Sequence, residues 1–247
     1  MSTSKYFPAR LNDKRRRCSK AQVKEILDKI KSDGRKLLFE DEVKRLLALN
    51  GIAVTPCEVA HNEDQAVQLA AKFGYPSVLK VRSVFYTHKS DCGGVKLNLP
   101  DENGVRMAFR EIRAAVAEQE PEACITVQPM AGAGTEVIIG VTTDNHFGKV
   151  IMFGLGGVFT EIFEDVTFRL IPITRKDAFE MLESVKGSML LEGYRGKPPA
   201  DRESLVEALL KVSKLVEDNE EIKELDLNPV VVYENGLLVL DGRGTLS

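Results

Sequence analysis

The sequence has no tryptophan, and aromatic residues make up only 6% of its 247 residues. Basic and aromatic residues are not interleaved, so we expect no surface on which nucleic-acid bases could stack. The formal net charge is only −3, which is too small to indicate a nucleic-acid partner for the chain as a whole. Composition therefore argues against nucleic-acid binding.

Cysteine and long apolar runs are also scarce. Each of the four cysteines is more than 30 residues from the next, so they indicate neither a CxxC zinc site nor a disulfide framework. No apolar run approaches the roughly 18 residues that a membrane span needs. The first residues also lack the apolar stretch of a secretory signal. We therefore expect a cytoplasmic protein with reduced thiols and no membrane contact.

What the sequence does contain is the composition of a globular protein, with 43% hydrophobic and 29% charged residues. A chain of this length can bury enough surface to fold without disulfides or a structural metal. The charge is uneven, because residues 1–50 hold 14 Lys and Arg against 7 Asp and Glu. We take residues 1–21, with the run Lys14–Arg17, as a basic N-terminal arm. Such a run is typical of a solvated terminus and less often binds phosphate.

Hydrophobic patterning and turn signals divide the chain into two halves of mixed α/β character. Up to residue 130, short apolar runs alternate with helical patterns, whereas the second half begins and ends with a β-hairpin. The halves meet near the glycine-rich residues 131–134. We therefore predict an α/β (mixed α+β) fold with two subdomains, residues 22–130 and 131–247.

The last hairpin places several oxygen-bearing side chains together. If Asn235-Gly236 form its two-residue turn, Asp241 lies opposite Val230, and Asn228 lies two positions further along the strand of Val230. Side chains two positions apart share a face of a strand, so Asp226, Asn228 and Asp241 project from one side. A few hard oxygen ligands suit a magnesium ion that also holds substrate phosphates. The same pattern is typical of a solvent-facing polar side of a hairpin.

Two further residues are candidates for phosphate chemistry. Lys80 lies inside the apolar run Ser77–Val81, and a buried ammonium needs a polar partner. That partner is either a bound phosphate or, more commonly, a carboxylate. His88 lies in a polar loop before Gly93-Gly94, and a neutral imidazole can act as a nucleophile. A lone histidine in such a loop is more often simply solvated.

Seven motifs, in order, resemble those of one family. The sequence resembles the ATP-grasp β subunit of ADP-forming acetyl-CoA (acyl-CoA) synthetases, which is related to succinyl-CoA synthetase, over roughly residues 22–243. The motifs are Gly74–Lys80, His88–Asp91, Gly93–Val95, Val127–Met130, Phe153–Gly157, Asp165–Leu170 and Leu227–Pro229.

The resemblance implies a fold and an activity. It implies an ATP-grasp fold whose two subdomains hold a nucleotide between them, with magnesium and with ATP or ADP as substrate. It implies the reaction acyl-CoA + ADP + phosphate ⇌ acid + CoA + ATP. It also implies a partner, a separate CoA-binding α subunit in an assembly that we expect to be α2β2.

The resemblance further implies a role for each of eight residues. By position these are Lys80 on the nucleotide phosphates, Gln128, Pro129 and Met130 in the hinge beside adenine, Glu136 at the phosphate and metal end, Asn228 and Asp241 on magnesium, and His88 as the phosphate carrier. Two other functions remain open at this point. One is a stand-alone ATP-grasp ligase that joins a carboxylate to an amine or thiol, and the other is a non-catalytic module that senses nucleotides.

Overall fold

The computed structural model describes residues 13–86, 89–157, 164–193 and 198–247. Its contacts divide the chain into two compact units. Unit 1 comprises the described residues up to Leu38, then Glu42–Val54 and those from Ala133 onwards, and unit 2 comprises Phe39–Asp41 and Thr55–Gly132. The units therefore differ from the expected subdomains over residues 22–54, of which only Phe39–Asp41 belong to unit 2, and at residues 131–132. The subdomain bounds themselves stay a prediction.

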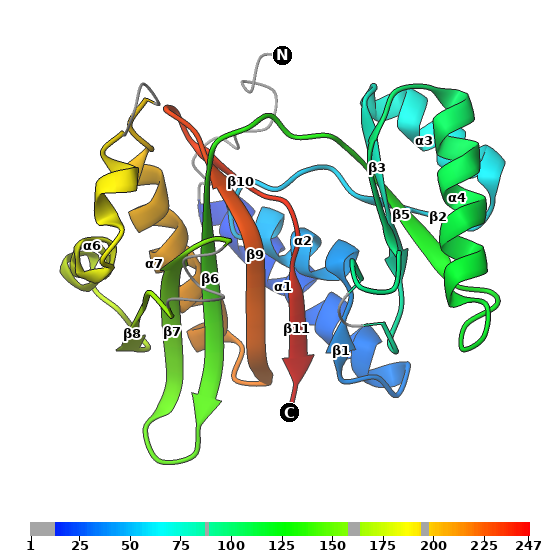
Figure 1. The fold of residues 1–247 in the computed structure, drawn as a ribbon. Coiled ribbons are helices and arrows are strands. Elements are labelled where there is room, and N and C mark those ends of the chain that lie inside the picture. The colour runs from blue at the N-terminus through cyan, green and yellow to red at the C-terminus, as the bar shows by residue number, and fades with distance from the viewer. Residues whose placement is uncertain (1–12, 87–88, 158–163, 194–197) are drawn as a thin grey trace. The chain divides into compact units, whose positions relative to one another are not determined.

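Unit 1 is built on an antiparallel sheet of seven strands in the order β1-β11-β9-β6-β7-β8, with β10 also pairing with β9 (Figure 1). Its strands are β1 (Leu37–Leu38), β6 (Thr135–Asp144), β7 (Gly148–Leu155), β8 (Val166–Leu170), β9 (Ile222–Val232), β10 (Leu237–Val239) and β11 (Arg243–Leu246).

The helices of unit 1 cover one face of this sheet, behind the strands in Figure 1. They are α1 (Asp13–Ser32), α2 (Glu40–Leu49), α6 (Arg175–Ser184), the short 3-10 helix η2 (Ser188–Leu191) and α7 (Arg202–Asp218). Their apolar residues form one core with alternate residues of the central strands, among them Val137, Ile139 and Phe153. The other face of the sheet carries no helix of the described part of unit 1, and we call it the open face.

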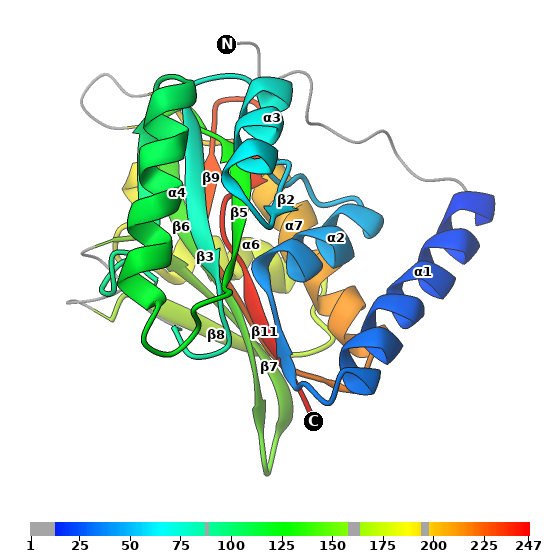
Figure 2. The same cartoon turned by 90° about the vertical axis from the view of Figure 1, so that its right-hand side faces the viewer.

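Unit 2 is a four-stranded antiparallel sheet in the order β2-β5-β3-β4, with two helices packed side by side on one face (Figure 2). Its elements are β2 (Glu58–Ala60), α3 (Glu63–Phe73), β3 (Ser77–Arg82), β4 (Val95–Leu99), α4 (Glu102–Val116) and β5 (Cys124–Pro129). Leu79 and Val81 of β3 join the core beneath the helices. Lys80, between them, therefore belongs to the opposite face.

Two local features follow from the bounds of the helices and strands. Helix α1 begins at Asp13, so the basic run Lys14–Arg17 is part of a helix. The apolar residues 52–54 form no strand, and only an isolated bridge joins Val54 to Val239. The strand instead follows at β2, after Pro56, which has no amide hydrogen to donate to a ladder. None of the described helices is long and apolar enough to cross a membrane.

Candidate nucleotide and metal site

The final hairpin turns one residue earlier than the sequence predicts. The amide of Tyr233 donates to the carbonyl of Gly236 at 2.9 Å, and Val239, not Asp241, is the partner of Val230. The predicted pairing of Asp241 with Val230 is therefore wrong. A type I′ turn over Asn235-Gly236 needs positive φ at both residues, but here only Gly236 has it, at 83°.

The corrected register brings the two predicted magnesium ligands closer together. The amide of Leu240 donates to the carbonyl of Pro229 at 3.0 Å, and Arg243 pairs with Asp226. Between these two points, Asp241 falls level with Asn228 on the neighbouring strand. Neighbouring strands lie about 4.8 Å apart, which is shorter than the diagonal separation that the predicted register implied.

The negative charge of Asp241 acts on the carboxyl group of Asp226. Burial raises the pKa of Asp226, the negative charge of Asp241 raises it further, and Arg243 opposes the shift. The Asp241 carboxylate also accepts a hydrogen bond from the amide of Gly242 at 2.8 Å. Two carboxylates that repel each other beside an amide oxygen, that of Asn228, are a donor set that fits a hard divalent cation.

Glu136 lies on the same open face. It is exposed on β6, four positions from Gly140, which pairs with Asp226. Strand residues an even number apart share a face. Gly156 comes close beside it, because a Cβ built at Gly156 would lie 2.9 Å from the Cβ of Glu136. A side chain at 156 would therefore displace Glu136.

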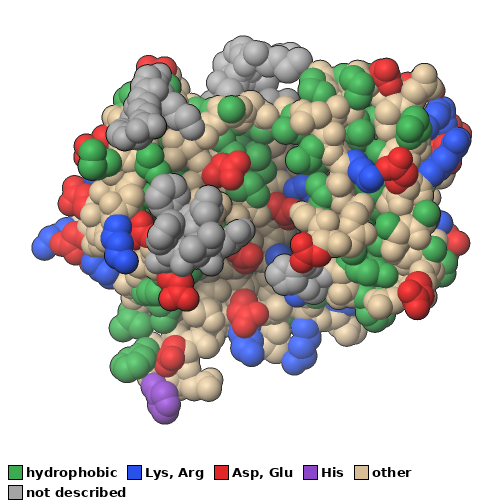
Figure 3. All heavy atoms as spheres, viewed as in Figure 1, with side chains coloured by type: hydrophobic (Ala, Val, Ile, Leu, Met, Phe, Trp, Pro, Cys, Tyr) green, Lys and Arg blue, Asp and Glu red, His purple; other side chains and the backbone are tan. Residues whose placement is uncertain are grey.

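A pocket of about 390 Å³ continues this face toward the β8 edge. It follows one row of the sheet, from Arg243 through Asp226 and Gly140 to Met152 and Phe168. Figure 3 shows acidic side chains at the surface over β6 and β9 on this side. Within the described ranges, no three His, Cys, Asp or Glu side chains cluster to hold a metal by themselves. An ion here would need oxygen ligands from its substrate.

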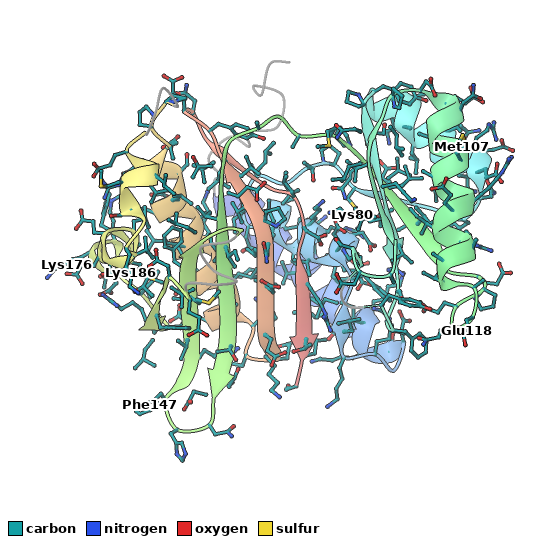
Figure 4. The ribbon with its side chains drawn as sticks, viewed as in Figure 1. Lys80, Met107, Glu118, Phe147, Lys176 and Lys186 are labelled. Atoms are coloured by element: carbon teal, nitrogen blue, oxygen red, sulfur yellow. The ribbon has the colours of Figure 1, made fainter. Side chains whose placement is uncertain are left out.

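Lys80 has the carboxylate partner that the sequence left as one of two possibilities. Figure 4 shows Lys80 on the side of β3 away from α3 and α4. Its side chain is 8% exposed, and its Nζ lies 2.9 Å from Oε1 of Glu40, a side chain that is 3% exposed. The other oxygen of Glu40 accepts from Lys89 at 2.7 Å. One buried carboxylate thus holds two ammonium groups.

The predicted hinge residues lie at the end of β5. Gln128 is buried, and its amide nitrogen donates to Oε1 of Glu40 at 2.9 Å while its oxygen accepts from Thr55 at 2.9 Å. Pro129 pairs with Ser77, and the amide of Met130 donates to the carbonyl of Pro76 at 2.9 Å. The side chain of Gln128 therefore has a structural task beside Lys80, and the role of these residues beside adenine stays a prediction.

Of the eight predicted residues, the structure groups Glu136, Asn228 and Asp241 in unit 1, and Lys80 with Gln128–Met130 in unit 2. His88 lies outside the described residues. Sequence reasoning missed Glu40 and Lys89, which contact Lys80 or its partner. A signal for Lys89 was present, because it follows His88 in the quoted motif, whereas nothing in the local pattern marks Glu40.

Comparison with known proteins gives the same fold. The profile of the family described as ATP-grasp domain matches residues 29–246. The acetate–CoA ligase (ADP-forming) I subunit beta of Pyrococcus furiosus is 42% identical over 226 residues, which cover 90% of this chain and 97% of that protein. The acetate–CoA ligase (ADP-forming) I of Archaeoglobus fulgidus is 44% identical over 92% of this chain but only 33% of its own length.

Solved structures of an acetyl-coenzyme A synthetase 1 from Ca. Korarchaeum cryptofilum are also similar. One, in complex with coenzyme A and Ca-AMPCP, has a TM-score of 0.88 and 45% identity, covering 91% of this chain and all of that one. Another contains Mg-AMPPCP, with its phosphohistidine segment pointing towards the nucleotide binding site, and has a TM-score of 0.80 at 43% identity and the same coverage.

The family match places this chain in the class of proteins that have an ATP-grasp domain. Within that class, the relatives that it covers from end to end are separate β subunits. The chain therefore belongs to the ATP-grasp family, in the group that contains the β subunits of ADP-forming acetate–CoA ligases.

Proposed function

We propose that the chain is the nucleotide-binding β subunit of an ADP-forming acyl-CoA synthetase, which catalyses acyl-CoA + ADP + phosphate ⇌ acid + CoA + ATP together with a CoA-binding α subunit. The observation that carries this proposal is coverage. The chain aligns with 97% and 98% of two separate Pyrococcus furiosus β subunits, at 42% and 44% identity. We expect the two kinds of subunit to assemble as α2β2.

The two units contribute different residues to nucleotide binding in this proposal. In unit 2, Lys80 binds the phosphates, and the backbone at Gln128–Met130 lies beside adenine. In unit 1, Asn228 and Asp241 hold magnesium with the phosphate oxygens, and Glu136 lies at the phosphate end. Three observations support the assignment in unit 1. Glu136, Asn228 and Asp241 lie on the open face of the sheet, the register sets Asp241 level with Asn228, and all three side chains carry hard oxygen donors. Magnesium, when bound, would neutralise phosphate charge during transfer.

His88 is the proposed phosphate carrier. Phosphate made on an α subunit must reach the bound ADP, and direct transfer needs reacting atoms about 3–3.5 Å apart. A covalent carrier divides the transfer into two displacements, each of which forms one N–P or O–P bond as another breaks. The phosphohistidine segment recorded in the Korarchaeum synthetase supports such a carrier in this family.

Co-expression with an α subunit tests the function directly. The complex should form ATP from acetyl-CoA, ADP and phosphate, and the isolated chain should not. ATP-dependent joining of an acid to an amine by the isolated chain would instead support a stand-alone ligase.

The variant His88→Ala tests the carrier separately. It should abolish ATP formation while leaving MgADP binding intact, because the nucleotide contacts remain. Radiolabelled ATP should label wild-type chain with an acid-labile phosphate and leave the variant unlabelled. Equal labelling of the variant would show that His88 is only a loop histidine.

A further inference from the structure

The network around Glu40 has a feature that a simple ion pair would not need. Oε1 of Glu40 accepts from Lys80 and from Gln128, each at 2.9 Å, and Oε2 accepts from Lys89 at 2.7 Å. Glu40 itself is only 5% exposed. The carboxylate of Glu40 is therefore held in place. The position of Lys80, which is proposed to bind phosphate, depends on this carboxylate.

The rest of the network fixes that carboxylate. Thr55 donates to the oxygen of the Gln128 amide, which leaves the amide nitrogen to point at Glu40. Glu40 is also the first residue of α2, where a negative charge is favoured by the helix dipole. The backbone of Lys89 is held as well, because its carbonyl oxygen accepts a hydrogen bond from the amide of Gly94 at 2.8 Å. A Cβ at Gly94 would lie 2.9 Å from that carbonyl oxygen.

A neighbouring pair on the same strand is arranged differently. Arg82, two residues after Lys80, donates from Nε and Nη2 to the two carboxylate oxygens of Asp41, at 2.8 and 3.3 Å. It also stacks over the ring of Phe39, with 3.9 Å from its Cζ to the ring centroid. Both side chains of that pair keep about a fifth of their surface exposed, 22% and 19%. It resembles an ordinary partly exposed ion pair, whereas Glu40 divides its charge between two cations in a buried place.

The division of charge matters because a phosphate must compete with Glu40 for Lys80. Charge pairs attract strongly where water is excluded, so a carboxylate that held Lys80 alone would oppose phosphate binding. We propose that Glu40 is the positioning residue of Lys80, and that Lys89 shares the charge of Glu40 so that Lys80 remains able to bind a nucleotide phosphate. This inference rests on the proposed nucleotide-binding function.

Calorimetric titration of MgADP into purified variants tests it. Lys89→Met should weaken MgADP binding about tenfold, because Glu40 then has one cation fewer to share its charge and attracts Lys80 more strongly. Adding Glu40→Gln to this variant should restore the Kd to within threefold of wild type, since the amide keeps an acceptor for Lys80 without the charge. Lys89→Arg, which keeps the charge, should bind as wild type does.

Arg82→Met is the matched control, because it removes a cation from the same strand and face. We expect it to change the Kd by less than threefold. An equal loss in Arg82→Met would show that only general charge matters, and unchanged binding in Lys89→Met, or no recovery in the double variant, would overturn the proposal. Lys89→Met keeps the contact of Lys80 with Glu40, so it should fold, and its thermal unfolding checks this.

The two proposals fail in different ways. If wild-type chain does not bind MgADP at all, the proposed function is wrong. If wild type binds and Lys80→Met weakens binding while Lys89→Met does not, the function stands and only the role of Lys89 and Glu40 is wrong.

Discussion

The two units arrange charged side chains on a sheet face in opposite ways. On the open face of unit 1, Asp226 and Asp241 repel each other, and the repulsion raises the pKa of Asp226. On the face of unit 2 opposite α3 and α4, the charges of Lys80 and Glu40 are buried in contact with each other. A bound cation would relieve the repulsion in unit 1. In unit 2 each charge already has a partner of opposite sign, so a bound phosphate would have to compete with Glu40 for Lys80.

This difference predicts which variants change stability and which change binding. Removing Glu40 from the network of unit 2 should leave Lys80 and Lys89 without the carboxylate that both contact. Removing a charge from the open face of unit 1 should relieve repulsion between Asp226 and Asp241 and weaken the binding of an ion. Three predictions test this contrast, from the largest expected effect to the smallest.

The largest effect should come from Glu40→Ala. It leaves Lys80 and Lys89 without the carboxylate that both contact, and breaking a buried pair from one side costs about 3–5 kcal/mol. Urea unfolding at neutral pH measures the loss. Asp41→Ala is the control in the same segment, and its more exposed pair with Arg82 should be worth only about 1 kcal/mol or less. Equal losses in the two variants would remove the contrast between a buried network and an ordinary ion pair.

The second effect should appear in binding and not in stability. Asp241→Asn removes a negative ligand, so we expect MgADP affinity to fall about tenfold, equivalent to about 1.4 kcal/mol. Its unfolding free energy should stay the same or rise, because Asp226 loses a like-charged neighbour. Calorimetry and urea unfolding of the same preparations measure both.

Glu224→Gln is the control for Asp241→Asn, since Glu224 lines the pocket of the same sheet face and bonds to Thr245. It should leave MgADP affinity within threefold of wild type. If it weakens binding as much as Asp241→Asn does, the open face acts only through its total charge and the assignment of Asp241 to magnesium is wrong.

The sequence predicted which side chains share a face of a strand better than it predicted which residues pair with each other. Strand alternation placed Asn228 and Asp241 on one side, and this survived a register error because the shift moved pairing by an even number of positions. The error arose because Asn235-Gly236 resembles a type I′ turn, although Asn235 does not adopt positive φ. Local sequence signals favour one turn type, but the tertiary contacts of the turn decide which type forms.

Glu40 could not have been found in the same way. It lies 40 residues from Lys80 and 88 from Gln128, and its burial exists only once these segments meet. Its sequence neighbours, Asp41 and Glu42, are equally acidic, so periodicity gives no reason to choose among them. Lys80 was identifiable because a charge inside an apolar run is unusual, whereas an acidic residue at a helix start is common.

The smallest effect concerns how unit 1 holds the hairpin that carries its open face. Asp201 caps α7 by accepting from the amide of Ser204 at 2.9 Å, and the same carboxylate accepts from the amide of Gly236 at 2.7 Å. Burial alone would raise the pKa of Asp201, but the hydrogen bonds from Ser204 and Gly236 outweigh it and lower the pKa below its ordinary value of 3.8. The charged form is thus favoured by folding.

Asp201→Ala should therefore cost about 1 kcal/mol at neutral pH, the usual value for a lost N-cap. Because the folded-state pKa is lowered, this contribution is complete above pH 3.8 and is lost as the pH falls through the folded-state value. Urea unfolding from pH 7 downward should show the wild type and Asp201→Ala converging in acid. The control in unit 2 is Asn62→Ala, which removes the uncharged cap of α3 and should cost a similar amount at every pH. A constant difference for Asp201→Ala would mean that the cap acts without its charge, and convergence for Asn62→Ala would place the acid effect elsewhere in the chain.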